Sequence, residues 1–249
     1  MDAKEFFGKY AEQYAKSDSH ARGSDLELLL KLISPEIGHA ALDLATGTGF
    51  TAVALAKRVK HVVALDKTEE MLEQGKMFAE KENVGNIEFV VGDVEQIPFE
   101  AGKFDIVTAR RATHHFPDKK KFLDEAMRVL KPGGMLGISD MVSPEGDEGD
   151  GFNTLERFRD HSHVGAETLS SFKALIKGAG FNVTEAVGTE ERVTFEKWLY
   201  PVPVESDEGK QCIEFLKSST PEFKKLIGYM EEGNSFIKRR AVIAAQKPI

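Results

Sequence analysis

Three short segments of the chain combine glycines and acidic residues in patterns that suit a nucleoside ligand. Gly47 and Gly49 follow an apolar run and let the backbone turn tightly beside a bound molecule. Asp66 ends the next apolar run, where a carboxylate can accept hydrogen bonds from both hydroxyls of a ribose. Asp93 follows Gly92 and can accept a hydrogen bond from an exocyclic amine such as that of adenine. Together the segments predict a nucleoside-binding site.

A second set of residues can transfer protons or hold an acceptor. His114 and His115 follow the predicted strand at 104–109 after a short gap, and His163 lies four residues beyond Arg159. Imidazole exchanges a proton near neutral pH, so histidine is the natural general base for an acidic oxygen or carbon nucleophile. If the segment around His163 is helical, Arg159 and His163 share one face. We expect these four residues on the catalytic side, although a capping or packing role for the histidines stays open. Asp140 can line the same pocket or cap a loop.

The elements that must position these residues alternate between strands and helices. Short apolar runs predict strands at 40–45, 61–65, 87–91, 104–109, 135–139, 181–195 and 240–246. Amphipathic segments predict helices at 26–33, 51–58, 69–83, 119–130 and 167–178. This alternation is typical of βαβ units, so we expect an α/β fold with a doubly wound, mostly parallel, seven-stranded sheet. In such sheets ligands bind at the carboxyl ends of the strands, where the residues above lie.

We expect the whole chain to form one domain with a core and covering segments. A helical N-terminal cap is expected at 1–34, and the core at 35–195 and 236–249. Two segments interrupt the alternation: an irregular, acidic, glycine-rich stretch at 143–166 and a helical insertion at 196–235 before the last strand. Long connections often serve as lids or binding loops, so both are expected to cover the acceptor side of the site.

Composition and charge restrict the class of protein. The net charge is −8, and the basic run Lys238-Arg239-Arg240 is short, so no nucleic-acid substrate is expected. One cysteine, Cys212, leaves no disulfide framework and no multi-cysteine zinc site; we expect an inert helix residue there and no metal. No apolar stretch reaches the length of a membrane span, and the first residues lack the apolar region of a signal peptide. The expectation is a soluble, cytoplasmic protein.

In combination, these segments resemble the class I S-adenosylmethionine (SAM)-dependent methyltransferases. The motifs that match this family are Leu42–Gly49, Leu65-Asp66, Gly92–Phe99, Phe104–Val107 and Leu130–Gly134. Within the class, the chain is most similar to small-molecule enzymes related to the ubiquinone/menaquinone C-methyltransferases, through Ala112–Phe116 and Arg159–Val164. The resemblance implies a Rossmann-like methyltransferase fold. It also implies methyl transfer from SAM to a small molecule, with S-adenosyl-L-homocysteine as the product.

The resemblance further implies a role for individual residues. Asp43 and the turn after it would hold the methionine end of SAM, and Asp66 would bind the ribose hydroxyls. Asp93 and the backbone of Val94 would bind the adenine. The backbone of Arg110, just after the fourth strand, would bind the amino group of SAM.

The N-terminal helix would cover the cofactor through Tyr14. The complete set of cofactor residues implied by the resemblance is Tyr14, Asp43, Ala45, Thr46, Gly47, Thr48, Gly49, Asp66, Lys67, Met71, Gly92, Asp93, Val94 and Arg110. Ala45 departs from the family, which usually has glycine at this position. Alanine tolerates most backbone conformations with negative φ, so we expect a slightly tighter turn and no loss of binding.

Two other functions remain open. Residues 47–52 also satisfy the G-x-G-x-x-A pattern of NAD-binding proteins with Asp66 beyond it, so an NAD-dependent oxidoreductase is one alternative. Against it, Asp93 would have no role, and the chain contains no Tyr-x-x-x-Lys pair. A protein that binds SAM without catalysis is the other alternative. The sequence specifies neither the acceptor nor the oligomeric state, and Trp198 and Tyr200 are candidates for an aromatic wall of the acceptor site.

Overall fold

The computed structural model describes residue 11 and residues 23–249. Its strands are β1 (Ala40–Leu44), β2 (His61–Asp66), β3 (Ile87–Val91), β4 (Phe104–Arg110), β5 (Leu130–Met141), β6 (Asn182–Thr194) and β7 (Ser235–Gln246). Its helices are α3 (Ser24–Ile33), α4 (Phe50–Ala56), α5 (Glu69–Lys81), the 3-10 helix η1 (Thr113–His115), α6 (Lys119–Val129), α7 (Gly151–Arg159), α8 (Leu169–Gly178), α9 (Phe195–Leu199), α10 (Asp207–Ser218) and α11 (Pro221–Leu226). Within the described residues, no helix is both long enough and apolar enough to cross a membrane.

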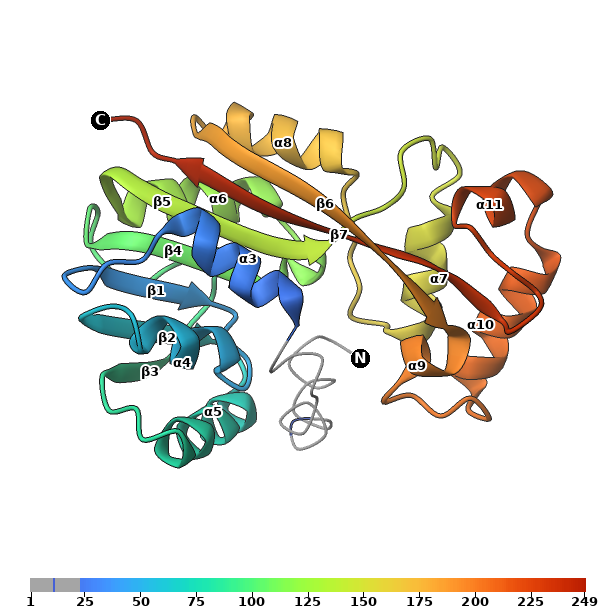
Figure 1. The fold of residues 1–249 in the computed structure, drawn as a ribbon, viewed down its shortest axis with the longest axis horizontal. Helices are drawn as coiled ribbons and strands as arrows, with labels where there is room; N and C mark the ends of the chain where they lie inside the picture. Colours follow the sequence, from blue (N-terminus) through green and yellow to red (C-terminus); the bar gives the residue numbers. More distant parts are fainter. Residues whose placement is uncertain (1–10, 12–22) are drawn as a thin grey trace.

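The seven strands form one sheet in the order β3-β2-β1-β4-β5-β7-β6 (Figure 1). Strands β1 to β5 run parallel to one another, whereas β7 is antiparallel to both β5 and β6. The strand order changes direction between β1 and β4, and ligands of such sheets bind outside the carboxyl ends at this switch point. The doubly wound, mostly parallel, seven-stranded fold predicted from the sequence is confirmed.

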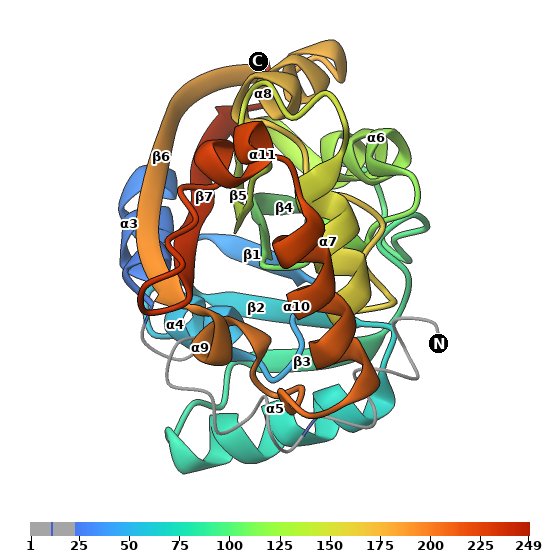
Figure 2. The ribbon, with the colours of Figure 1, turned by 90° about the vertical axis from the view of Figure 1, so that its right-hand side faces the viewer.

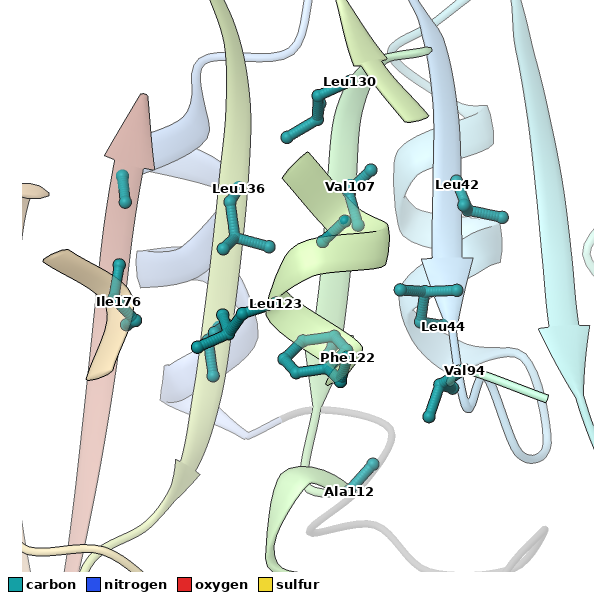
Figure 3. Packing of buried hydrophobic residues seen from close by; sticks show 14 of the residues in the cluster. Leu42, Leu44, Val94, Val107, Ala112, Phe122, Leu123, Leu130, Leu136 and Ile176 are labelled. Carbon is teal, nitrogen blue, oxygen red and sulfur yellow. The ribbon is translucent and has the colours of Figure 1, made fainter. Parts of the chain in front are cut away.

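Helices cover both faces of the sheet because its central strands are apolar on both sides. On one face, Leu29 and Ile33 of α3 and Leu55 of α4 belong to one buried cluster with residues of the central strands. On the opposite face, Phe122 and Leu123 of α6 lie over β4 and β5 (Figure 3). Because both faces are closed, a ligand can approach the central strands only at their ends.

Helices α7, α9, α10 and α11 form a second layer, the helical lobe, at the far end of the long β6–β7 hairpin (Figures 1 and 2). Its apolar core includes Trp198, Cys212 and Phe236. Helix α7 lies in the stretch 143–166, so the expectation of an irregular segment there is wrong: an amphipathic helix forms because one of its faces is buried. The insertion expected at 196–235 is helical. The division of the chain into core, cap and cover stays a prediction, and most of the expected cap lies outside the described residues.

Two strands begin earlier than their sequence patterns predicted. Strand β5 begins at Leu130 instead of 135, because Leu130 pairs with Phe104 and a register shift follows. Strand β7 begins at Ser235 instead of 240, because its first half pairs with β6 although polar residues interrupt its apolar pattern. The longer β7 reaches the helical lobe.

Candidate active site

A pocket of about 210 Å³ lies at the carboxyl ends of the strands on either side of the switch point. The cofactor residues implied by the sequence that line it are Ala45, Thr46, Gly47, Thr48, Asp66, Lys67, Met71, Gly92, Asp93, Val94 and Arg110. Asp43 and Gly49 are not part of this lining, and Tyr14 lies outside the described residues. Residues that follow four different strands therefore converge on one pocket.

The turn after β1 is held by Asp43. Its carboxylate accepts hydrogen bonds from the hydroxyls of Thr46 and Thr108, each at 2.7 Å. The Asp43 side chain is 1% exposed, and this burial raises the pKa of its carboxyl to about 6. Asp43 thus fixes the shape of the turn from the interior.

Ala45 has a φ angle of +50°, which contradicts the expectation of a negative φ at this position. In the left-handed region the Cβ atom approaches the following carbonyl oxygen, at a cost of about 1–2 kcal/mol for a residue other than glycine. Gly47 and Gly49, with φ angles of 55° and 78°, adopt positive values without this penalty. The turn therefore stores strain at its alanine, and the same geometry explains why glycine is usual there.

Asp66 connects this turn to the end of β2. One carboxylate oxygen accepts a hydrogen bond from the Gly47 backbone N–H at 2.8 Å, and the other accepts from the Thr68 backbone N–H at 2.9 Å. Burial raises the pKa of the Asp66 carboxyl. An ionised carboxylate has about four acceptor positions, so each oxygen keeps capacity for a further donor from the pocket. Asp66 both shapes the pocket and offers acceptors to a ligand.

The segment after β3 places Asp93 at the rim of the pocket. The Asp93 side chain is exposed, and one of its oxygens accepts a hydrogen bond from the Glu95 backbone N–H at 2.8 Å. Val94 and Ile97 are buried and anchor the segment beneath it. A carboxylate is therefore held on a fixed turn beside the opening.

Arg110 and Arg111, at the end of β4, line the pocket and share one buried acid. Asp25 of α3 accepts hydrogen bonds from Arg110 at 2.7 and 3.0 Å and from Arg111 at 2.7 Å. Burial alone would raise the pKa of Asp25, but the bonds and charges of the two arginines hold it well below its usual range. The pair of guanidinium groups is thereby fixed next to the pocket by a residue far away in the sequence.

His114 is oriented by Asp140. Its Nδ1 atom lies 2.7 Å from Asp140 Oδ1, and Asp140 Oδ2 accepts from the Thr113 hydroxyl at 2.6 Å and the His114 backbone N–H at 3.1 Å. Burial would raise the pKa of Asp140, but His114 and Thr113 together hold it below its usual range. Because the carboxylate is ionised, His114 donates from Nδ1, which leaves Nε2 available to accept a proton.

The three predicted histidines lie together. The ring centroid of His114 is 4.0 Å from that of His115 and 5.4 Å from that of His163. Burial, followed by repulsion from His114 when that ring is protonated, lowers the pKa of His115 to about 3 and that of His163 to about 4. Both rings are therefore neutral near pH 7. Of the three, His115 alone belongs to the pocket lining described above.

The hydrogen bonds of the two flanking histidines differ. His115 Nδ1 lies 3.0 Å from the Ser162 carbonyl oxygen, and its Nε2 atom lies 3.8 Å from Asp160 Oδ2. His163 Nε2 lies 2.8 Å from Asn153 Oδ1 and donates to it. The buried His163 Nδ1 atom has no hydrogen-bond partner within the described residues.

Arg159 and His163 do not share a helical face, because α7 ends at Arg159; that expectation is wrong. Arg159 instead forms an ion pair with Glu156 at 2.9 Å, and Trp198 Nε1 donates to the same carboxylate at 2.9 Å. Burial would raise the pKa of Glu156, but the nearby cations, Arg159 first, lower it to about 2. The charge of Glu156 also acts on His163, so Arg159 and His163 border the same buried acid.

The surroundings of the remaining candidate residues, Trp198, Tyr200 and Cys212, do not favour a role in binding the acceptor. Trp198 is 3% exposed in the core of the lobe, whereas Tyr200 is 57% exposed, so the two do not form one aromatic wall. Cys212 is fully buried, and burial raises the pKa of its thiol to about 12, which agrees with an inert residue. In the part of the chain that the structure describes, no group of three or more His, Cys, Asp or Glu side chains is arranged to hold a metal ion.

Comparison with known proteins identifies the family. A sequence model of a methyltransferase domain matches residues 42–138. The uncharacterised methyltransferase YcgJ of Bacillus subtilis is 34% identical over 217 residues, which make up 87% of this chain and 86% of the relative. The chain belongs to the class I methyltransferase family. Membership favours methyl transfer over the NAD-dependent alternative.

Two further relatives support the assignment of this methyltransferase. The crystal structure of a candidate methyltransferase from Bacillus halodurans is 37% identical, with a TM-score of 0.85, and the match covers 91% of this chain and 100% of that one. The demethylmenaquinone methyltransferase of Clavibacter sepedonicus is 40% identical over 114 residues, which are 46% of each protein. The match to this last relative thus covers only about half of its length.

Sequence reasoning missed two buried acids of this methyltransferase, Asp25 and Glu156. Both lie on the apolar stripe of an amphipathic helix: Asp25 shares a face with Leu29, and Glu156 shares one with Phe152. An acid at such a position must be paired if it is to stay ionised, so its place in the pattern is a signal for a buried ion pair. The sequence alone does not indicate the partner.

Proposed function

We propose that this methyltransferase transfers a methyl group from SAM to a small-molecule acceptor and releases S-adenosyl-L-homocysteine. The observation that carries the proposal is the convergence of the residues after β1, β2, β3 and β4 on a single pocket. From the sequence, the segments after β1 and β4 were assigned to the methionine end of the cofactor, the segment after β2 to its ribose and the segment after β3 to its adenine. We further propose that the protein acts in the cytoplasm and that nucleic acid is not its substrate.

The chemistry of the pocket suits SAM. Asp66 has acceptor capacity for the ribose hydroxyls, and exposed Asp93 can accept from the adenine amine, with the Val94 backbone beside it. The turn held by Asp43 and the backbone of Arg110 would contact the methionine end. SAM, when bound, supplies an activated methyl group on a sulfonium whose departure needs little further activation. Tyr14 stays a prediction as the residue that covers the cofactor.

Within this function we assign His114 as the general base. Asp140 fixes the ring through Nδ1, so Nε2 can remove a proton from an acidic oxygen, carbon or nitrogen nucleophile of the acceptor. His115 and His163 are neutral near pH 7, and their rings flank the proposed base. Arg159 is the fourth residue proposed on the acceptor side. The rest of the rate enhancement would come from positioning the acceptor next to the methyl group and from excluding water, since the leaving group is already good.

Calorimetric titration with SAM tests the binding half of the proposal. We expect wild type to bind SAM, and Asp66→Asn to bind it at least about tenfold more weakly because one carboxylate acceptor becomes a donor. Glu73→Gln on neighbouring α5 is the matched control; Glu73 is exposed and pairs with Lys76, so its loss should leave the affinity unchanged. Absence of SAM binding together with tight NADH binding would instead support the oxidoreductase alternative.

Formation of S-adenosyl-L-homocysteine from SAM in the presence of small phenols, acids or amines as methyl acceptors tests the catalytic half. With an active acceptor, His114→Asn should keep its affinity for SAM and lose at least about a hundredfold in rate, the usual contribution of a general base. An undiminished rate in this variant would exclude His114 as the base. If SAM binds and no acceptor is turned over, the protein is the non-catalytic SAM-binding alternative.

A further inference from the structure

Two cations on β7, Lys238 and Arg240, have no ion pair or side-chain hydrogen bond among the described residues. They are two positions apart on a regular strand, so their side chains leave the same face of the sheet. Both side chains are partly buried. Arg239 between them points to the opposite face and pairs with Glu190 at 2.9 Å. The two cations are therefore set apart from the neighbouring arginine by strand geometry.

The carboxylates nearest to these cations are engaged elsewhere. These carboxylates interact electrostatically with Lys238 or Arg240, but none forms an ion pair with them within 4.0 Å. These acids and their partners are Asp25 with Arg110 and Arg111, Asp140 with His114, Glu156 with Arg159, and Glu191 with Lys197. Among the described residues, the side chains of Lys238 and Arg240 are therefore left without a carboxylate in direct contact.

Such an arrangement is unfavourable in the absence of an anion. Burial lowers the pKa of Lys238 to about 7 and that of Arg240 to about 10. Two further cations, Arg111 and Arg159, lie close enough to Lys238 for their charges to lower its pKa as well. Partly buried charges usually have partners, and clusters of perturbed groups are frequent at binding sites.

The position of the pair relates it to the pocket. Arg240 lies opposite Met141 on β5, next to Asp140, which orients His114. Arg111 acts electrostatically on both cations and also lines the cofactor pocket. On the other side, Glu156 and Arg159 connect Lys238 to the helical lobe. The pair thus lies between the pocket, the proposed base and the lobe.

We propose that the methyl acceptor is an anion and that Lys238 and Arg240 bind its carboxylate or phosphate group. This assignment rests on the proposed function, because it places the acceptor on the lobe side of the proposed SAM site. A guanidinium can bind a carboxylate or phosphate through two parallel hydrogen bonds, while the ammonium of Lys238 adds a point charge. Binding of the anion supplies the missing negative partner and keeps Lys238 protonated.

The test is a calorimetric titration of protein saturated with S-adenosyl-L-homocysteine, using succinate and inorganic phosphate as separate probes. We expect millimolar binding of at least one probe by wild type, which also tells a carboxylate preference from a phosphate preference. Lys238→Gln and Arg240→Gln should each weaken this binding about tenfold or more, as expected for a lost hydrogen bond to a charged group. Arg239→Gln, the matched control on the opposite face, should bind as wild type does.

Failure of both probes to bind wild type would overturn the proposal, and so would equal binding by wild type and the two variants. An equal loss in Arg239→Gln would also overturn it, because the effect would then reflect overall charge. Thermal unfolding checks that the variants fold: removal of an unpaired, partly buried cation should leave the melting temperature unchanged or raise it.

The cofactor titration separates this proposal from the proposed function. Lys238→Gln and Arg240→Gln should bind S-adenosyl-L-homocysteine with wild-type affinity, since neither residue lines the cofactor pocket. If wild type itself binds neither SAM nor this product, the proposed function fails, and the anion titration on the cofactor-free protein still decides whether the two cations form an anion site.

Discussion

Asp43→Asn is predicted to stabilise the cofactor-free protein near neutral pH and to have little effect in acid. Asp43 is 1% exposed and accepts hydrogen bonds from Thr46 and Thr108. Asparagine has nearly the same shape, and its amide can pair with both hydroxyls, because a hydroxyl can either donate or accept. The substitution therefore removes a buried charge and keeps the contacts that hold the turn.

The size of the effect follows from the pKa of Asp43, which burial raises from the ordinary 3.8 to about 6. Between these values the folded protein binds more protons at Asp43 than the unfolded chain does, so stability falls as the pH rises through this interval. At about 1.36 kcal/mol for each pH unit, the ionised carboxylate lowers the free energy of unfolding by about 3 kcal/mol above pH 6. Asparagine does not titrate, so the variant should exceed wild type by up to about 3 kcal/mol at pH 8 and by about half of that at pH 5.

Urea unfolding followed by the fluorescence of buried Trp198 measures this difference at pH 4, 5, 6 and 8. Subtraction of wild type from variant at each pH cancels the titration of the other groups. Asp124→Asn, at an exposed acid that pairs with Lys120, is the control and should give only a small difference. A difference between Asp43→Asn and wild type that is constant from pH 4 to pH 8, or a wild type that is the more stable at pH 8, would refute the reasoning.

Two further substitutions test the strain and the ion pairs around the pocket. Ala45→Gly should raise the free energy of unfolding by roughly 0.5–1 kcal/mol in urea titrations, because relief of left-handed strain exceeds the entropy that glycine adds to the unfolded chain; a loss of stability would contradict this. Asp25→Asn should lower it by about 3–5 kcal/mol, because Arg110 and Arg111 lose the carboxylate that pairs with both of them in the interior. Glu27→Gln, at the exposed acid on the same helix, is the control for the second experiment, and equal melting temperatures of the two variants would rule out a stabilising role for the Asp25 pairs.

The fold could be predicted from the sequence because its signals are local. Strands β1, β2 and β3 are short apolar runs with a glycine or an acid at or just after their ends, and the covering helices show apolar stripes. The positions of Asp66 and Asp93 at successive strand ends follow from the same pattern, since the carboxyl ends of parallel strands meet at one edge of the sheet. The pocket could therefore be located before any tertiary contact was known.

Other features of the site depend on contacts between distant segments. Nothing near Arg110 in the sequence indicates that its guanidinium pairs with Asp25, which lies on a helix 85 residues earlier. The left-handed φ of Ala45 is imposed by bonds from Asp43 and Asp66 to the turn, and not by its own residue type. Helix α7 was not predicted from the sequence, because its single apolar face is short and lies within a stretch rich in glycine and acidic residues. Local propensity cannot supply these features, because tertiary packing determines them.

The run Lys238-Arg239-Arg240 illustrates what strand geometry adds to composition. In the sequence it is a short basic patch, too small to suggest a polyanion. In the structure the alternation of β7 divides it, and the face that carries Lys238 and Arg240 continues to Phe236 on one side and Val242 on the other. Phe236 belongs to the core of the lobe and Val242 to the core of the sheet, so the two cations occupy the interval between two apolar clusters. In this interval both side chains keep part of their surface exposed, and the proposed anion would bind them there.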